Sequence, residues 1–216
     1  MINECTSEQI ENGWTRIAVT FTPSVAGTYT LAGCTDWIYG TSSFDDLQLE
    51  KGSAASSYNY LINGDAEWAD GWSFSAGASR AALTAIHGSY AVKITGDMKT
   101  KRTASITVPL NISSDTTLVL SGWAQATSAA DIAKDKSSER AFGLEAVLTY
   151  SDNTTETHYV SFDGSSSHLQ YTSLNIVPKK TGSTIKNAVI RCVYGKNANT
   201  AYFDNISLKK RTSCLL

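Results

Sequence analysis

The sequence feature that most constrains the fold is a short pattern that occurs twice. One copy is Tyr202-Phe203-Asp204-Asn205-Ile206-Ser207-Leu208, and an altered copy is Ser43-Phe44-Asp45-Asp46-Leu47-Gln48-Leu49. Each copy has an aromatic residue, then an acidic or acid–amide pair, and then alternating apolar and polar residues. Alternation with a period of two is typical of a half-buried β-strand. The pattern therefore indicates an internal repeat whose last element is a strand.

Two further landmarks precede each copy in the same order. Thr22-Pro23 corresponds to Val177-Pro178, and Tyr39-Gly40 corresponds to Tyr194-Gly195. Chance does not readily place three landmarks in register. The first copy predicts strands over residues 14–22, 27–33 and 44–49, and the second predicts strands over 171–177, 188–194 and from 203 onward.

The stretch between the copies supplies the rest of a β-domain. Short alternating or apolar runs predict strands over 90–95, 104–110, 117–126, 142–150 and 157–162. Charged residues make up only 18% of the chain, and proline occurs only at Pro23, Pro109 and Pro178. Short β-branched and aromatic runs joined by polar turns favour an all-β, two-sheet antiparallel sandwich of an extracellular type. The polar stretch 129–140 is expected to be a long loop.

The repeat also predicts the domain boundaries. Residues 1–52 are expected to be the closing strands of an incomplete upstream sandwich, 53–60 a small-residue linker, 61–210 a complete module and 211–216 a tail. Strands of a partial sandwich leave edges and an apolar face without partners. They must pack on the complete module, pair with another chain in self-association, or remain largely disordered.

Charge and cysteine usage exclude several classes of function. The net charge of −2 provides no basic field for nucleic acid, and no apolar run reaches the roughly 18 residues that span a bilayer. The first residues lack the features of a signal peptide, as expected for the interior of a longer chain. Cys5, Cys34, Cys192 and Cys214 are widely spaced, so a zinc site is not expected and their disulfide state stays open; Cys192 is expected to be a core thiol.

The sequence contains no recognisable catalytic pattern. His87, His158 and His168 lack metal-ligand spacing, and no GxSxG motif occurs. A glycosidase would need two carboxyl groups across a cleft, and nothing in the sequence places Glu67, Glu145 or Asp204 in that way. We therefore expect a protein that is not an enzyme.

Four segments together resemble jelly-roll carbohydrate-binding modules of the family 4, 16 and 22 type, as found in large bacterial cell-surface and repeat-containing proteins. They are Asn63-Gly64-Asp65-Ala66-Glu67 before Gly71-Trp72, His87-Gly88-Ser89-Tyr90-Ala91-Val92-Lys93-Ile94, Leu120-Ser121-Gly122-Trp123-Ala124, and the closing motif from Tyr202 to Leu208. Their order and spacing carry the resemblance, which covers residues 61–210, with the tail of a second copy in 14–51.

The resemblance implies a structural calcium that ties the first strand to the last. The matching residues are Asp204 and Glu67, with Asp65 and the carbonyls of Asn63 and Gly88 as weaker candidates. Calcium takes about six to eight oxygen ligands, so acids distant in sequence would have to meet backbone carbonyls. The alternative is that Asp204 caps a turn and that Glu67 is solvated.

In this fold class, sugars bind to aromatic faces and to planar polar groups. Alternation puts Trp123 and Gln125 on the same face of their strand as Ser121, and it leaves Glu145, Tyr171 and Arg191 opposite apolar neighbours. We expect one sheet to present all five: Trp123, Gln125, Glu145, Tyr171 and Arg191. Alternatively, Glu145 and Arg191 form a cross-strand ion pair, and Trp123 and Tyr171 lie under the 129–140 loop or the N-terminal strands.

The leading hypothesis is a non-catalytic module that binds a poly- or oligosaccharide as part of a larger extracellular or cell-surface protein. The alternative is a structural spacer or adhesion repeat that binds no sugar, and an enzyme would need a deep pocket with two carboxyl groups. The sequence does not specify which glycan binds, because specificity depends on loop geometry.

Overall fold

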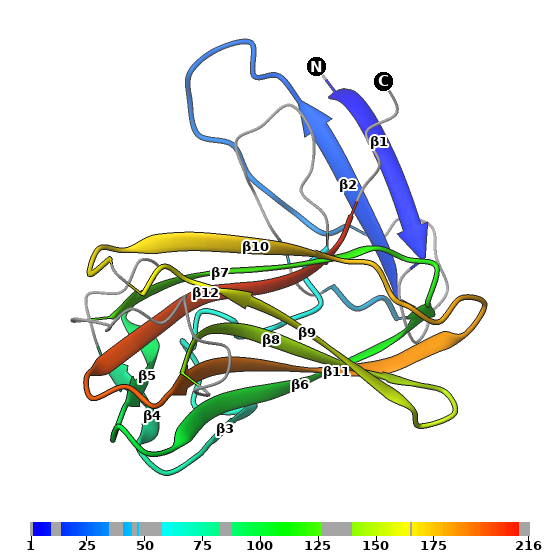
Figure 1. Ribbon diagram of the computed structural model, residues 1–216. Coiled ribbons are helices and arrows are strands. Elements are labelled where there is room, and N and C mark those ends of the chain that lie inside the picture. The colour runs from blue at the N-terminus through cyan, green and yellow to red at the C-terminus, as the bar shows by residue number, and fades with distance from the viewer. Residues whose placement is uncertain are drawn as a thin grey trace. The chain divides into compact units, whose positions relative to one another are not determined.

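The computed structural model describes residues 2–9, 14–34, 41–44, 47, 58–82, 88–126, 140–164 and 166–211 (Figure 1). The chain divides into two compact units, Met1–Ser56 and Ser57–Leu216, and each is described by itself. Every regular element in the described ranges is a β-strand. Within those ranges, no helix is long and apolar enough to cross a membrane.

The second unit is a sandwich of two antiparallel sheets with five strands each (Figure 1). The first sheet has the strand order β10 (Gln170–Ile176), β7 (Leu118–Ala126), β12 (Thr200–Lys210), β5 (Tyr90–Thr95) and β4 (Ala78–Ala82). The second sheet has the order β3 (Trp72–Phe74), β6 (Lys101–Ser113), β11 (Thr184–Gly195), β8 (Ala141–Tyr150) and β9 (Thr155–Ser161). The predicted all-β, two-sheet antiparallel sandwich is confirmed.

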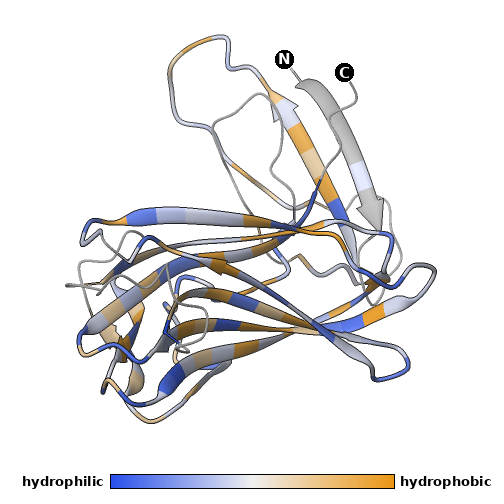
Figure 2. Cartoon of the chain, viewed as in Figure 1, coloured by the Kyte–Doolittle hydropathy of each residue, from blue (hydrophilic) through white to orange (hydrophobic). Residues whose placement is uncertain are grey.

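The core fills the space between the two sheets. Buried residues alternate with less buried ones along much of β6 and β7, and Figure 2 shows apolar residues, in orange, interspersed with polar ones along the strands. Phe142 lies at the centre of an aromatic cluster, with ring centroids 5.0 Å from Phe162 and 5.7 Å from both Tyr194 and Phe203. Cys192 is buried in this core as a free thiol, as predicted. The sandwich therefore has two outward faces, one on each sheet, that do not contribute to the core.

Most strands of the second unit were predictable. The strand predicted over residues 90–95 is β5, and the other predicted strands differ from β6 to β12 only at their ends. The short strands β3 and β4 were missed. The sequence of β4, Ala-Ser-Arg-Ala-Ala, has no β-branched or large aromatic residue, so its conformation depends on pairing with β5. Residues 129–139 of the predicted loop lie outside the described residues.

The first unit contains an antiparallel pair of strands, β1 (Ile2–Gln9) and β2 (Thr15–Phe21). The strand predicted over 14–22 is confirmed as β2. The strand predicted over 27–33 is wrong: these residues are described and form no strand, and the described ladder of this unit joins β1 to β2. Of residues 44–49, only Phe44 and Leu47 are described, and neither is in a strand. The assignment of residues 1–52 to an incomplete sandwich stays a prediction, as does self-association through it.

The repeated motif of the second unit forms β12, which pairs with β7 on one side and with β5 on the other. A bulge between Asp204 and Ser207 interrupts the ladder with β7, and Asn205 has a φ of 49° there. The segment before β3 attaches beside this bulge. The Ile206 amide donates to the Gly64 carbonyl (2.8 Å), and a Cβ at Gly64 would clash with the Ile206 carbonyl oxygen, so glycine is required for this close approach.

Candidate functional site

The structure divides the five predicted ligand-binding residues between the two sheets. Trp123 and Gln125 are on β7 and Tyr171 is on β10, all in the first sheet. Glu145 is on β8 and Arg191 is on β11, both in the second sheet. The expectation that one sheet presents all five is therefore wrong. Alternation identifies the outward side chains of a strand, but it does not say to which sheet that strand belongs.

An aromatic pair lies on the outer side of the first sheet. Tyr171 is directly opposite Trp123 in the β10–β7 ladder, with ring centroids 5.3 Å apart and ring planes at 54°. The Tyr171 side chain is 53% exposed, and Trp123 is half-buried. Two neighbouring rings with an accessible edge form an apolar platform bounded by polar groups.

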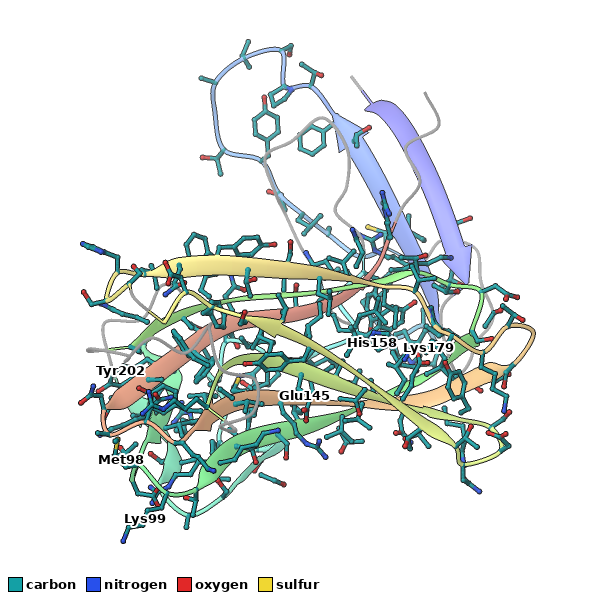
Figure 3. The ribbon with its side chains drawn as sticks, in the orientation of Figure 1. Met98, Lys99, Glu145, His158, Lys179 and Tyr202 are labelled. Atoms are coloured by element: carbon teal, nitrogen blue, oxygen red, sulfur yellow. The ribbon has the colours of Figure 1, made fainter. Side chains whose placement is uncertain are left out.

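Three polar residues continue this surface across the sheet. Tyr202 is opposite Gln125 on one side and opposite Lys93 on the other, so the three lie in one row across β7, β12 and β5. The Gln125 amide donates to the carbonyl of Ser167 (3.0 Å), which fixes its orientation. We call Trp123, Gln125, Tyr171, Tyr202 and Lys93 the first-sheet face; Figure 3 labels Tyr202 near the start of β12. Tyr202 and Lys93 were not predicted from the sequence, although both alternate with core residues of their strands.

Asp204 lies beside the aromatic pair. The β12–β7 register places it opposite Trp123, and only 3% of it is exposed. Its Oδ1 accepts a hydrogen bond from the Asn205 amide (2.7 Å) at the bulge. Next along the ladder, the hydroxyls of Ser121 and Ser207 share a buried hydrogen bond (2.8 Å). These contacts stabilise β12, which pairs with β7 beside Trp123.

The outer side of the second sheet is built around an ion pair. Glu145 is directly opposite Arg191, whose Nη1 donates to Oε1 (2.6 Å), and the Lys101 ammonium is 3.4 Å from Oε2. Glu145 is only 8% exposed. The alternative interpretation of Glu145 and Arg191 as a cross-strand ion pair is therefore confirmed.

A single tyrosine adjoins this pair. Tyr159 on β9 is opposite Glu145 and is 41% exposed, and a Cβ at Gly143 would stand 2.5 Å from its hydroxyl oxygen. Burial of the hydroxyl, and secondarily the charge of Glu145, raises the pKa of Tyr159 to about 12. Glu145, Arg191, Lys101 and Tyr159 are called the second-sheet face; Figure 3 labels Glu145 on its strand.

The residues predicted as metal ligands make protein contacts around residues 61–71, the segment directly before β3, which we call the opening segment. The Asn63 carbonyl accepts hydrogen bonds from the Trp72 indole (2.9 Å) and the Ala66 amide (3.1 Å). Oε1 of Glu67 accepts hydrogen bonds from the amides of Ser89 and Tyr90, both at 2.8 Å. An oxygen has two lone pairs, so these two atoms are already fully used.

The other predicted ligands complete this picture. Asp65 Oδ1 accepts a hydrogen bond from the Glu67 amide (3.4 Å), and Gly88 packs against the Glu67 carboxyl group. Among the described residues, no group of three or more His, Cys, Asp or Glu side chains is arranged to hold a metal ion. The predicted set does not fit calcium through Asn63 O and Glu67 Oε1, and a calcium site that uses the remaining oxygens stays a prediction.

The acids with perturbed ionisation are stabilised in their charged form. Burial alone would raise the pKa of Glu156, but hydrogen bonds with His158 (2.8 Å) and the Lys179 amide hold it below its usual value. Figure 3 labels His158 and Lys179 together at this edge of the sandwich. The amides of Thr100 and Lys99 hold the pKa of Asp97 well below its usual range, and Lys180 does the same for Asp152. A catalytic acid would need the opposite shift.

Comparison with known proteins identifies a fold. No protein-family model matches the sequence, and no curated protein matches it. Among solved structures, a family 16 carbohydrate-binding module is 21% identical, with 69% of this chain and 99% of that chain covered and a TM-score of 0.45. A Clostridium thermocellum xylanase containing a family 22 module, solved with xylohexaose, is 9% identical, with 73% and 28% covered and a TM-score of 0.50.

The fold is also that of an enzyme. A Stig cyclase from Fischerella sp. TAU is 11% identical, with 73% of this chain and all of that chain covered (100%) and a TM-score of 0.52. The fold alone therefore does not separate a binding module from a catalyst. What the comparisons establish is that the chain has the jelly-roll β-sandwich fold seen in carbohydrate-binding modules, as the sequence resemblance implied.

Proposed function

We propose that the protein is a non-catalytic carbohydrate-binding module of a larger bacterial surface or secreted protein and that it binds an oligosaccharide on the first-sheet face. The observation that carries the proposal is the contact between Trp123 and Tyr171 on the outside of the sandwich. The solved xylanase with a family 22 module and bound xylohexaose supports the substrate class by analogy of fold.

The first-sheet face has both kinds of group that sugars require. The C–H side of a pyranose ring packs on an aromatic face, and its hydroxyl groups need hydrogen-bonding partners at the edge of that contact. Trp123 and Tyr171 provide the apolar contact. Gln125 provides a planar amide and Lys93 a charged donor, and the two lie on either side of Tyr202 in the same row of the sheet.

The second-sheet face is the weaker candidate. Its carboxylate is engaged with Arg191 and Lys101, so a sugar hydroxyl would have to displace a protein cation to reach it. Tyr159 is the one aromatic residue assigned to that face, and it lies over Gly143. A flat ring beside a satisfied ion pair gives less apolar contact than two rings together.

The ionisation of three acids supports the proposal of binding without catalysis. Glycoside hydrolysis requires a carboxylic acid that keeps its proton near neutral pH, opposite a second carboxylate. The pKa values of Asp97, Asp152 and Glu156 are all shifted in the opposite direction, downward. The expected outcome is that incubation with any bound oligosaccharide releases no reducing sugar.

The experiment is a glycan-array screen followed by calorimetric titration of the best binder. Trp123→Ala should weaken binding by about tenfold or more, because truncating a central aromatic anchor costs at least about 1.4 kcal/mol. Tyr159→Ala is the matched control, because it removes an exposed aromatic from the opposite sheet and should leave the affinity unchanged. The proposal fails if no glycan binds, or if the Trp123 variant binds like the wild type.

The second candidate is a structural spacer or adhesion repeat. It is favoured by the presence of the motif in both compact units, around Phe44 in one and Phe203 in the other. A spacer would bind no glycan and would give an elongated particle when several copies are joined. Small-angle scattering from several copies of the second unit linked in tandem distinguishes the two functions.

A further inference from the structure

The opening segment of the second unit brings two consecutive carbonyls to one side chain. Nε of Arg80 on β4 donates to the carbonyl of Ala66 (2.6 Å), and Nη2 donates to the carbonyl of Glu67 (2.5 Å). Ala66 is fully buried and has a φ of 55°, in the left-handed region. This conformation is uncommon for alanine and persists only where surrounding contacts hold it.

The same guanidinium is covered on one face by an aromatic ring. Its Cζ is 3.1 Å from the centroid of the Tyr90 ring, at the start of β5. The amides of Tyr90 and its neighbour Ser89 bind the side chain of Glu67, whose carbonyl Arg80 contacts. The opening segment, β4 and β5 are therefore joined through one cation and one carboxylate.

Physical chemistry explains why a cation is needed here. Two adjacent carbonyl dipoles directed at one point repel each other, and a planar guanidinium with several fixed N–H donors satisfies both. A tyrosine face adds a cation–π attraction. The Asn63 carbonyl and Glu67 Oε1, two of the oxygens that the resemblance assigned to calcium, already accept two hydrogen bonds each, and Arg80 binds the nearby carbonyls of Ala66 and Glu67.

We propose that Arg80 is the cation that fixes the opening segment to the first sheet, whereas the sequence resemblance implied a calcium that ties the first strand to the last. Stability of the second unit then depends on Arg80 and does not depend on calcium. This inference is independent of whether the first-sheet face binds a sugar.

The first test is thermal unfolding of the wild-type protein in calcium chloride and in excess EGTA. The expected result is the same Tm in both, because a ligand that binds only the folded state would raise it. A higher Tm in calcium overturns the proposal. This measurement needs no variant and so cannot be lost to misfolding.

The second test replaces the arginine. Arg80→Ala should lower the Tm by about 5–10 °C, because the carbonyl of the buried Ala66 and that of the partly buried Glu67 lose charge-assisted hydrogen bonds. Arg80→Lys keeps the charge but not the planar fork, and should give a smaller loss and a folded protein if the alanine variant does not fold. An unchanged Tm in both variants overturns the proposal.

Amide hydrogen exchange shows whether the effect is local. In Arg80→Lys, the amides of Ser89, Tyr90 and Ile206 should exchange faster, because each is bonded to the segment that Arg80 holds. Arg102→Ala is the matched control: Arg102 also bonds a carbonyl, that of Thr95, at a different turn. It should leave those three amides unchanged, and equal acceleration in both variants contradicts a local role.

Discussion

The two outer faces of the sandwich differ in the contacts that their side chains make within the protein. On the first-sheet face, Trp123 and Tyr171 contact each other and remain partly exposed. On the second-sheet face, the nearly buried Glu145 is bonded to Arg191 and Lys101. Apolar rings can exchange water for a ligand without breaking a protein contact, whereas charged groups must first release their partners. The comparison shows that an outward polar cluster is not by itself a binding site.

The largest expected effect is on ligand affinity at the first-sheet face. The double variant Trp123→Ala/Tyr171→Ala should bind glycan about 100-fold more weakly, a loss of about 2.7 kcal/mol. Because the rings touch, the sum of the two single losses should differ from the double loss by about 0.5–1.5 kcal/mol in a double-mutant cycle measured by calorimetry. Strict additivity would show that the rings do not act as one platform.

The next effect is on stability at the second-sheet face. Arg191→Ala should lower the free energy of unfolding by about 1–2 kcal/mol, since it leaves the Glu145 carboxylate with only the more distant Lys101. Urea unfolding gives the stability, and titration of the folded variant should give wild-type glycan affinity. A large loss of glycan affinity in this variant would indicate that the ligand binds to the second-sheet face and not to the first-sheet face.

A smaller effect should appear on acidification. The pKa of Glu156 is lowered in the folded protein, so its contribution to stability is present above the unfolded pKa and is lost as the pH falls through the folded value. Urea unfolding between neutral and acid pH should show this decline, and Glu156→Gln should make it shallower. Glycan affinity of the folded protein is the control measurement and should not follow this decline, because Glu156 is on β9 in the second sheet and is not part of the first-sheet face.

The smallest effect is expected from replacing the ion pair as a whole. Glu145→Leu combined with Arg191→Met should change the free energy of unfolding by less than about 1 kcal/mol, because both charges are removed together. Chemical denaturation of this variant beside Arg191→Ala makes the test. If the double variant is less stable than Arg191→Ala, the ion pair makes a net favourable contribution to the free energy of unfolding, and the prediction is wrong.

Local sequence patterns predicted the strands but not their assembly. Alternation located β5 and identified Leu120 and Ala124 as inward and Trp123 as outward. It could not reveal that β7 and β8, which are successive strands, belong to different sheets, because that depends on long-range pairing. This is why Glu145 and Arg191 were grouped with Trp123.

The loops were the least predictable part of the site. Asn63 was predicted to offer its carbonyl to a metal, but its side chain binds the backbone of Trp68 and Asp70 and its carbonyl receives the Trp72 indole. Arg80 lies in a stretch of small residues and carried no pattern. Its role became visible only when β4 was paired with β5 and brought it against Ala66.

The position of β12 has a consequence for how the chain folds as it is made. Every other described strand precedes it in the sequence, yet β12 lies between β5 and β7 in the first sheet. Until the ribosome has released it, β5 and β7 each have an open edge, and the inner side of the first sheet has a gap. Open edges recruit strands from neighbouring chains. Nascent chains on the same messenger RNA are therefore most prone to aggregate with one another just before β12 emerges from the ribosome. A chain truncated before β12 should be insoluble.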